Sequence, residues 1–143
     1  MSHLTVHASV KLGAFMLDHI TIGVSDFDRS TAFYDQALAP LGIRRLFDVP
    51  PDRSGGVAVT GYGDDQPRFW LAGEKTTSGL LHVAFLAKVR AEVDAFYAAA
   101  MGAGGTDNGA PGLRPQYHAH YYAAFVLDPD GHNIEAVCHL PSE

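Results

Sequence analysis

An internal repeat constrains the fold of this chain more than any other feature. Residues 32–42 read AFYDQALAPLG and residues 95–105 read AFYAAAMGAGG. At the same offset of 63 residues, DHITIGV at 18–24 falls on LHVAFLA at 81–87, which places His19 on His82. A repeat of this length is a duplicated supersecondary unit, and one copy cannot bury its own apolar face. The sequence therefore predicts two similar halves that share a core and are related by a pseudo-twofold axis.

The composition is that of one compact domain. The chain has 143 residues, of which 47% are hydrophobic and 18% charged, enough to bury a core. Ten basic against 16 acidic residues give a net charge of −6, and no basic run is present. This balance argues against nucleic acid and anionic membranes as partners. The start lacks the pattern of a signal peptide, and the single cysteine, Cys138, fits a reducing compartment. We expect a cytoplasmic protein with an N-terminal arm at residues 1–16, followed by one domain at 17–143.

Alternation and capping signals predict the elements of the first half (module 1, residues 17–75). Ile20, Ile22 and Val24 alternate with smaller or polar residues, as in a half-buried strand. Ser25 and Asp26 are N-cap candidates for the helix that follows. The expected elements are a strand at 19–24, a helix to about residue 39, a strand at 43–49, and a hairpin of strands at 57–62 and 68–72.

The second half (module 2, residues 80–140) is predicted to repeat this plan. We expect a strand at 81–87, a helix with apolar residues at 89, 93, 96 and 100, a long connection rich in Gly and Pro at 102–119, and closing strands at 121–127 and 132–139. Asp128, Asp130 and Gly131 are assigned to turn geometry, and His132 is expected to face solvent. Each half is thus predicted as a βαβββ module. The expected fold class is α+β, with both modules forming an open, barrel-like sheet around a central cavity.

Strand alternation directs three potential metal ligands to one side of the sheets. Glu135 lies between apolar residues that suit the helix-packed face, so its own side chain points into the cavity with His19 and His82. A carboxylate in that position is costly unless it is paired or metal-bound. Aligning the hairpins of the two halves requires an offset of 65 residues and places Glu135 on Trp70. Two imidazoles and one carboxylate suit Fe(II), Mn(II) or Zn(II). Taken singly, a strand histidine is more often an ordinary core or surface residue, and Glu135 is also compatible with a solvent-exposed strand position, so the prediction of a metal site rests on their conjunction.

The segments DHITIGVSDFDRSTAFYDQALAPLG, LHVAF and DPDGHNIEAV closely resemble the vicinal oxygen chelate superfamily of glyoxalase I, fosfomycin-resistance proteins, extradiol dioxygenases and bleomycin-resistance proteins. The resemblance covers about residues 17–140. It implies paired βαβββ modules around one divalent metal ion (Fe, Mn, Zn or Ni), with His19, His82 and Glu135 at the metal positions. It also implies a small-molecule substrate and a homodimer, in which modules are sometimes exchanged between chains. Glyoxalase I usually has an acid where this chain has Trp70, so ordinary glyoxalase I activity is not expected.

Five residues are further site candidates. Thr21 matches a threonine that contacts substrate in fosfomycin-resistance proteins, and we take it as a catalytic candidate. Alternation sends one of two neighbouring tyrosines inward; Tyr122 is taken as catalytic, to orient a substrate or relay a proton, and Tyr121 as substrate-binding. Arg114 suits a substrate carboxylate or phosphate, and Trp70 suits stacking on an aromatic ligand. Each of the five also has an ordinary reading as a strand-forming, loop or packing residue.

The sequence leaves several functions open. The leading hypothesis is a metal-dependent small-molecule enzyme of the glyoxalase/dioxygenase type, with lyase, isomerase, transferase and dioxygenase chemistry all compatible. The alternative is a metal-free protein that sequesters an aromatic molecule, as bleomycin-resistance proteins do; Trp70 and the tyrosines favour it. A third possibility is a degenerate relative that serves only as an interaction module.

Overall fold

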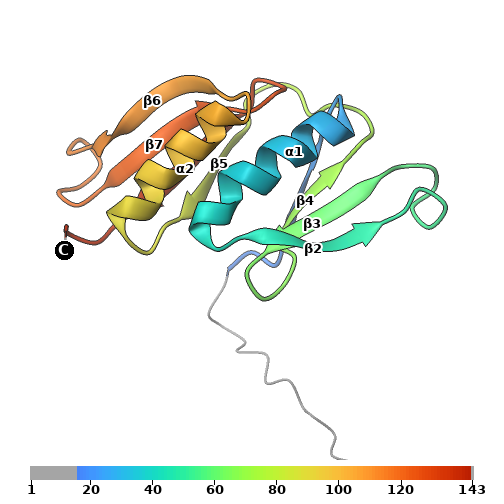
Figure 1. Cartoon of the computed structure of the whole chain (residues 1–143), viewed down its shortest axis with the longest axis horizontal. Coiled ribbons are helices and arrows are strands. Elements are labelled where there is room, and N and C mark those ends of the chain that lie inside the picture. Colours follow the sequence, from blue (N-terminus) through green and yellow to red (C-terminus); the bar gives the residue numbers. More distant parts are fainter. Residues whose placement is uncertain (1–15, 143) are drawn as a thin grey trace, which may run out of the picture.

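The computed structural model describes residues 16–142, and its two halves follow one plan (Figure 1). The first half contains β1 (Ile20–Gly23), α1 (Phe27–Leu38), the 3-10 turn η1 (Ala39–Leu41), β2 (Arg44–Val49), β3 (Val59–Gly63) and β4 (Phe69–Ala72). The second contains β5 (His82–Leu86), α2 (Arg90–Gly102), β6 (Thr106–Leu113), β7 (Tyr122–Leu127) and β8 (Asn133–Cys138). The expected arm lies outside the described residues, apart from Met16. No helix within residues 16–142 has the length and apolar character needed to cross a membrane.

The prediction that residues 102–119 form one long connection is wrong for residues 106–113. Thr106–Leu113 is strand β6, which pairs antiparallel with β7 and forms the edge of its sheet. Its Gly and Pro residues predict a loop, but an edge strand tolerates them because it needs only one partner strand and accommodates irregularities. Its register shifts between Asp107 and Gly109 and again between Gly109 and Gly112. The remaining loop is therefore short, and it spans residues 114–121.

The pairing of the strands follows the repeat. The two sheets have the orders β1-β4-β3-β2 and β5-β8-β7-β6. In the parallel pair β1–β4, Thr21 lies opposite Trp70, and in the parallel pair β5–β8, Ala84 lies opposite Glu135. The offsets of 63 and 65 residues read from the sequence are thus the offsets of the folded strands. The α+β architecture of two βαβββ modules is confirmed, and in the described part of the chain the two sheets remain separate.

The core lies between the sheets and the helices. α1 and α2 lie next to each other over the same side of the two sheets (Figure 1). Asp26 caps α1 by accepting a hydrogen bond of 3.1 Å from the backbone N–H of Arg29. The rings of Phe69 on β4 and Phe85 on β5 meet edge to face with centroids 5.1 Å apart, so the two modules share one core. We call the opposite side of the sheets, which carries Trp70 and Glu135, the open face.

The turn between β7 and β8 connects the two modules. Asp128 and His132 are 4% and 5% exposed, so the expectation that His132 faces solvent is wrong. The Asp128 carboxylate accepts hydrogen bonds from the Tyr34 hydroxyl on α1 (2.6 Å) and from the backbone N–H groups of Asp130 and His132 (both 2.9 Å). The His132 ring lies between Asp128 (3.2 Å) and the backbone oxygen of Thr77 (2.8 Å). α1 and the linker between the modules therefore bury Asp128 and His132, the two ends of this turn.

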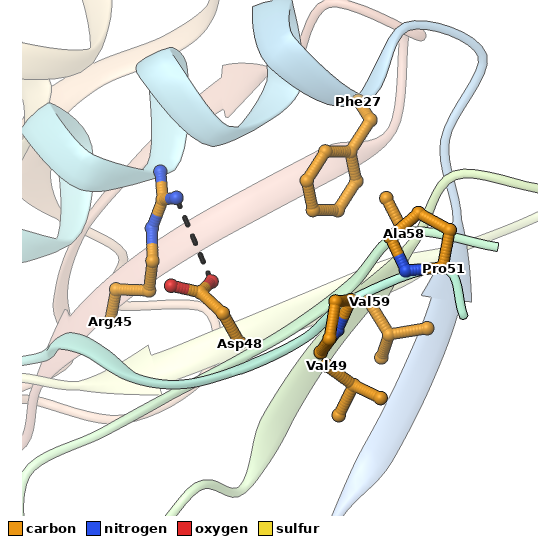
Figure 2. A pocket seen from close by; sticks show the side chains of 8 residues that line it. Phe27, Arg45, Asp48, Val49, Pro51, Ala58 and Val59 are labelled. Carbon is orange, nitrogen blue, oxygen red and sulfur yellow. Dashed lines mark ion pairs between the residues drawn. The ribbon is translucent and has the colours of Figure 1, made fainter. Parts of the chain in front are cut away.

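A groove of about 230 Å³ opens on the helix side of the first module. Its walls come from the start of α1, from β2, from β3 and from the loop between these strands: Phe27, Arg45, Asp48, Val49, Pro50, Pro51, Ala58 and Val59. Figure 2 shows the Phe27 ring facing apolar side chains, with the ion pair of Arg45 and Asp48 (3.7 Å) at one end. The groove belongs wholly to the first module and lies on the other side of the sheet from the open face.

Candidate functional site

A buried carboxylate marks the open face of the second module. Glu135 is only 1% exposed, although it lies in the middle of β8. Its Oε1 is 2.8 Å from Nε2 of His82, and its Oε2 accepts a short hydrogen bond from the hydroxyl of Tyr121. The His82 side chain is 42% exposed, so solvent reaches the pair through the imidazole. Both carboxylate oxygens are thus engaged by groups that alternation places on this face.

Strand pairing explains how the sequence builds this pair. β8 lies between β5 and β7, which places Ala84 on one side of Glu135 and Phe125 on the other. The Phe125 ring lies 6.0 Å from the His82 ring and forms a wall beside it. The Arg114 guanidinium carbon lies 5.4 Å from the Phe125 centroid. Gly109 permits this arrangement, because a Cβ there would meet the Phe125 ring at 2.9 Å. Arg114, a predicted substrate-binding residue, therefore lies on the same face as Glu135.

The two neighbouring tyrosines point to opposite faces. Burial, together with the hydrogen bond to Glu135, raises the pKa of Tyr121, so its hydroxyl remains a donor into the alkaline range. The Tyr122 hydroxyl instead bonds Asp94 on α2 at 2.6 Å, and Arg90 lies over its ring. The structure thus places Tyr122 on the helix side, away from Glu135, contrary to its expected catalytic position. Tyr121 is the tyrosine that faces the predicted metal ligands.

His19 lies apart from the other predicted ligands. Its Nδ1 is 2.6 Å from the Asp18 carboxylate, its side chain is 54% exposed, and this hydrogen bond lowers the pKa of Asp18. Within residues 16–142, no three His, Cys, Asp or Glu side chains form a group that could hold a metal ion. The structure therefore brings His82 and Glu135 together in one chain, and it leaves His19 with Asp18.

The open face of the first module is aromatic. Trp70 lies over Gly61, where an added Cβ would come within 2.9 Å of the indole ring. Phe47 on β2 meets this indole with ring centroids 6.2 Å apart, and Phe47 is 57% exposed. Thr21 lies opposite Trp70 on β1 and is also exposed. Two of the predicted site residues, Thr21 and Trp70, thus lie together in the first module.

Three residues near Glu135 were not predicted as site residues. Phe125 was recoverable from the register of the closing hairpin, since it lies directly opposite Glu135. His118 and His139 were not recoverable, because their contact joins a loop to the end of β8. Nε2 of His118 lies 2.7 Å from Nδ1 of His139, and both rings pack against Tyr121 with centroids 5.5 and 5.3 Å away.

Comparison with known proteins confirms the resemblance to the vicinal oxygen chelate superfamily. The model of the glyoxalase/bleomycin resistance protein/dioxygenase superfamily matches residues 16–136, and the chain belongs to this superfamily. A glyoxalase/bleomycin resistance protein from Albidiferax ferrireducens T118 is 30% identical over 88% of this chain and 100% of its own, with a TM-score of 0.70. A glyoxalase-related enzyme from Fulvimarina pelagi is 24% identical over 85% of this chain and 86% of its own, with a TM-score of 0.61.

More distant structures show the fold alone. Glyoxalase I from Zea mays is 23% identical over 85% of this chain, with a TM-score of 0.61, and the match spans 45% of the maize chain. No curated protein matches the chain. The comparisons therefore establish the superfamily and the fold of the chain.

Proposed function

We propose that this chain is a metal-dependent enzyme that acts on a small molecule, with a divalent metal ion held by His82, Glu135 and His19. The observation that carries the proposal is the buried Glu135 carboxylate, with Nε2 of His82 only 2.8 Å from Oε1. These two atoms lie on the open face, and an imidazole nitrogen and a carboxylate oxygen are ligands that Fe, Mn, Zn and Ni ions accept. The pair would therefore supply two of the ligands of such an ion. When bound, such an ion acts as a Lewis acid or a redox centre.

The proposal assigns the third ligand to a second copy of the chain. His19 precedes β1 in the other sheet and does not join the pair within one chain. A partner whose first module covers this open face would bring its own histidine to the pair. Exposed apolar side chains on the same face support such pairing: Leu86, which alternates with His82, is 68% exposed, and Phe47 is 57% exposed. A symmetric homodimer of this kind would contain two equivalent sites.

The surrounding residues have separate roles in this proposal. Arg114, packed on Phe125, would bind a carboxylate or phosphate of the substrate bidentately. Thr21 would orient a substrate oxygen from the opposing module. The absence of an acid at the position of Trp70 argues against glyoxalase I chemistry. Lyase, isomerase, transferase and dioxygenase reactions are the classes to screen.

Metal reconstitution of the full-length protein tests this proposal. After treatment with a chelator, the protein is dialysed against Fe(II), Mn(II), Zn(II) or Ni(II) and analysed for bound metal. We expect about one ion per chain, and we expect the H82A variant to lose it. W70F replaces the indole on the open face of the first module with a smaller aromatic ring, changes no proposed ligand, and should retain the ion. If wild-type protein retains no divalent ion under any condition, the proposal is wrong.

One observation favours a second candidate function, the metal-free sequestration of an aromatic molecule. Trp70 and the exposed Phe47 form an aromatic surface on the first module that does not involve the proposed ligands. Trp70 is the single tryptophan of the chain, so its fluorescence reports on this surface alone. This function requires quenching by ligand that persists in EDTA and in H82A. Loss of quenching in EDTA would exclude it.

A further inference from the structure

We infer that Tyr121 is a positioning residue for Glu135, and that the contact between His118 and His139 holds Tyr121 in place. The inference rests on the proposed function, because it assigns Glu135 as a metal ligand. It changes the expected role of Tyr121 from substrate binding to control of the carboxylate. It also adds the β6–β7 loop, residues 114–121, to the site.

The first step is the orientation of the carboxylate. Glu135 is 1% exposed, and the Tyr121 hydroxyl donates to Oε2 while Oε1 faces Nε2 of His82. A ligating carboxylate that is hydrogen-bonded on its second oxygen is fixed in rotation and presents the other oxygen to a metal ion. Without the Tyr121 hydroxyl, Oε2 would lose this donor at a position that water hardly reaches. The carboxylate would then rotate toward other donors.

The second step is the support of Tyr121 itself. Its backbone N–H donates to the His118 carbonyl at 3.2 Å, and its carbonyl accepts the Arg114 N–H at 2.7 Å. Its ring lies among those of Tyr117, His118 and His139, with centroids 4.9, 5.5 and 5.3 Å away. Both the backbone and the ring are therefore held, which fixes the direction of the hydroxyl.

The third step links this loop to the strand that carries Glu135. Nδ1 of His118 accepts the backbone N–H of His120 at 3.1 Å, so Nε2 carries the proton and donates to Nδ1 of His139 at 2.7 Å. The planes of the two rings lie within 22° of each other, with centroids 5.0 Å apart. His139 directly follows β8, which contains Glu135. The histidine pair thus fastens the β6–β7 loop to the ligand-bearing strand.

Tyr122, the next residue along the chain and the first of β7, provides a matched control. Its hydroxyl also bonds a carboxylate at 2.6 Å, but that carboxylate belongs to Asp94 on α2. Y121F and Y122F therefore each remove one hydroxyl and one tyrosine–carboxylate hydrogen bond. Only Y121F removes the bond to Glu135.

Titration of the full-length protein with Co²⁺ alone tests the inference. We expect Y121F to bind Co²⁺ about 10- to 100-fold more weakly than wild type and to show a changed visible absorption spectrum. Y122F should match wild type in both measurements. H139A should also weaken binding, but the double variant Y121F/H139A should bind no more weakly than Y121F, because the histidines act through Tyr121. Equal Co²⁺ affinity in Y121F and wild type, or additive effects in the double variant, would overturn the inference.

Crystal structures of metal-free wild type and Y121F separate this inference from the proposed function. We expect a single orientation of the Glu135 carboxylate in wild type. In Y121F we expect the carboxylate to be rotated or to occupy two orientations. An unchanged carboxylate in Y121F would overturn the positioning role whether or not metal binds. If wild type fails to bind Co²⁺ while the carboxylate moves in Y121F, the metal site is wrong and the positioning of Glu135 by Tyr121 stands.

Discussion

The open faces of the two modules have the same strand register but opposite chemistry. In the first module, Gly61 on β3 lies opposite Trp70 on β4; in the second, Phe125 on β7 lies opposite Glu135 on β8. The bulky aromatic side chain has moved from one strand of the pair to the other. As a result, the position that Trp70 occupies on β4 is occupied by the Glu135 carboxylate on β8. Duplication thus supplies two equal scaffolds, and the residues at these two positions decide which of them carries the buried carboxylate.

The hairpin turns differ in the same way. The first module's turn, residues 64–67, is largely exposed, whereas Asp128 and His132 in the second module's turn are buried under α1 and the linker. Asp128 receives the Tyr34 hydroxyl from the other module. The second module therefore carries both a buried carboxylate that receives a hydrogen bond from the first module and the buried half of the proposed site. Four predictions test this asymmetry.

The largest expected effect is on stability, at Asp128. Asp128→Ala leaves the Tyr34 hydroxyl and the His132 ring without their common acceptor, and breaking a buried charged network of this kind costs about 3–5 kcal/mol. Asp64→Ala, in the exposed turn of the first module, should change the free energy of unfolding by less than about 0.5 kcal/mol. Urea unfolding of both variants measures the difference. Equal values would show that the two turns contribute alike.

The next effect is on metal binding, at Glu135. Glu135→Gln keeps the shape of the side chain but replaces a charged oxygen with an amide, so we expect at least about 100-fold weaker binding of a divalent ion, or about 2.7 kcal/mol. Isothermal titration with Mn²⁺ or Zn²⁺ measures the affinity. Unchanged affinity would place the metal elsewhere.

The reciprocal change tests whether the modules are interchangeable. Trp70→Glu installs a carboxylate at the position equivalent to Glu135, and Trp70→Gln is its neutral match. If the two open faces meet around one ion, the Glu variant should bind a divalent ion about tenfold more tightly than the Gln variant, a difference of about 1.4 kcal/mol. Titration of both variants under identical conditions gives this ratio. A ratio near one would show that Trp70 lies too far from the ion to contribute.

The smallest effect is an alkaline loss of stability. Burial, reinforced by Asp128, raises the pKa of Tyr34 well above its ordinary value near 10. The folded protein therefore keeps the proton that the unfolded chain releases, and the contribution of Tyr34 to the free energy of unfolding is constant well below pH 10 and falls as the pH rises past 10. Replacing Tyr34 with Phe should remove about 0.8 kcal/mol of the loss between pH 8 and pH 10.5. Urea midpoints at both pH values provide the measurement, and an identical loss in Tyr34→Phe and wild type would contradict the assignment.

The alternation of side chains made most of the architecture predictable. A strand has a period of two, so Glu135 between Ile134 and Ala136 had to face away from the helices. The repeat added the offset that pairs Glu135 with Trp70, and the strand register follows that offset. Strand β6 was missed because Gly and Pro oppose strand formation locally, and only its pairing with β7 at the sheet edge compensates.

What the sequence determined is therefore the periodic part of the molecule: two βαβββ modules, the face of each strand, and the residues that occupy equivalent positions. What only the tertiary structure decided are contacts between segments without a periodic relation. Tyr34 reaches Asp128 across 94 positions, His118 meets His139 across 21, and Tyr121 rather than Tyr122 contacts Glu135. Periodicity places a side chain on a face, but a hydrogen bond also requires a distance and a direction. Those depend on how loops and helices pack once the chain has folded.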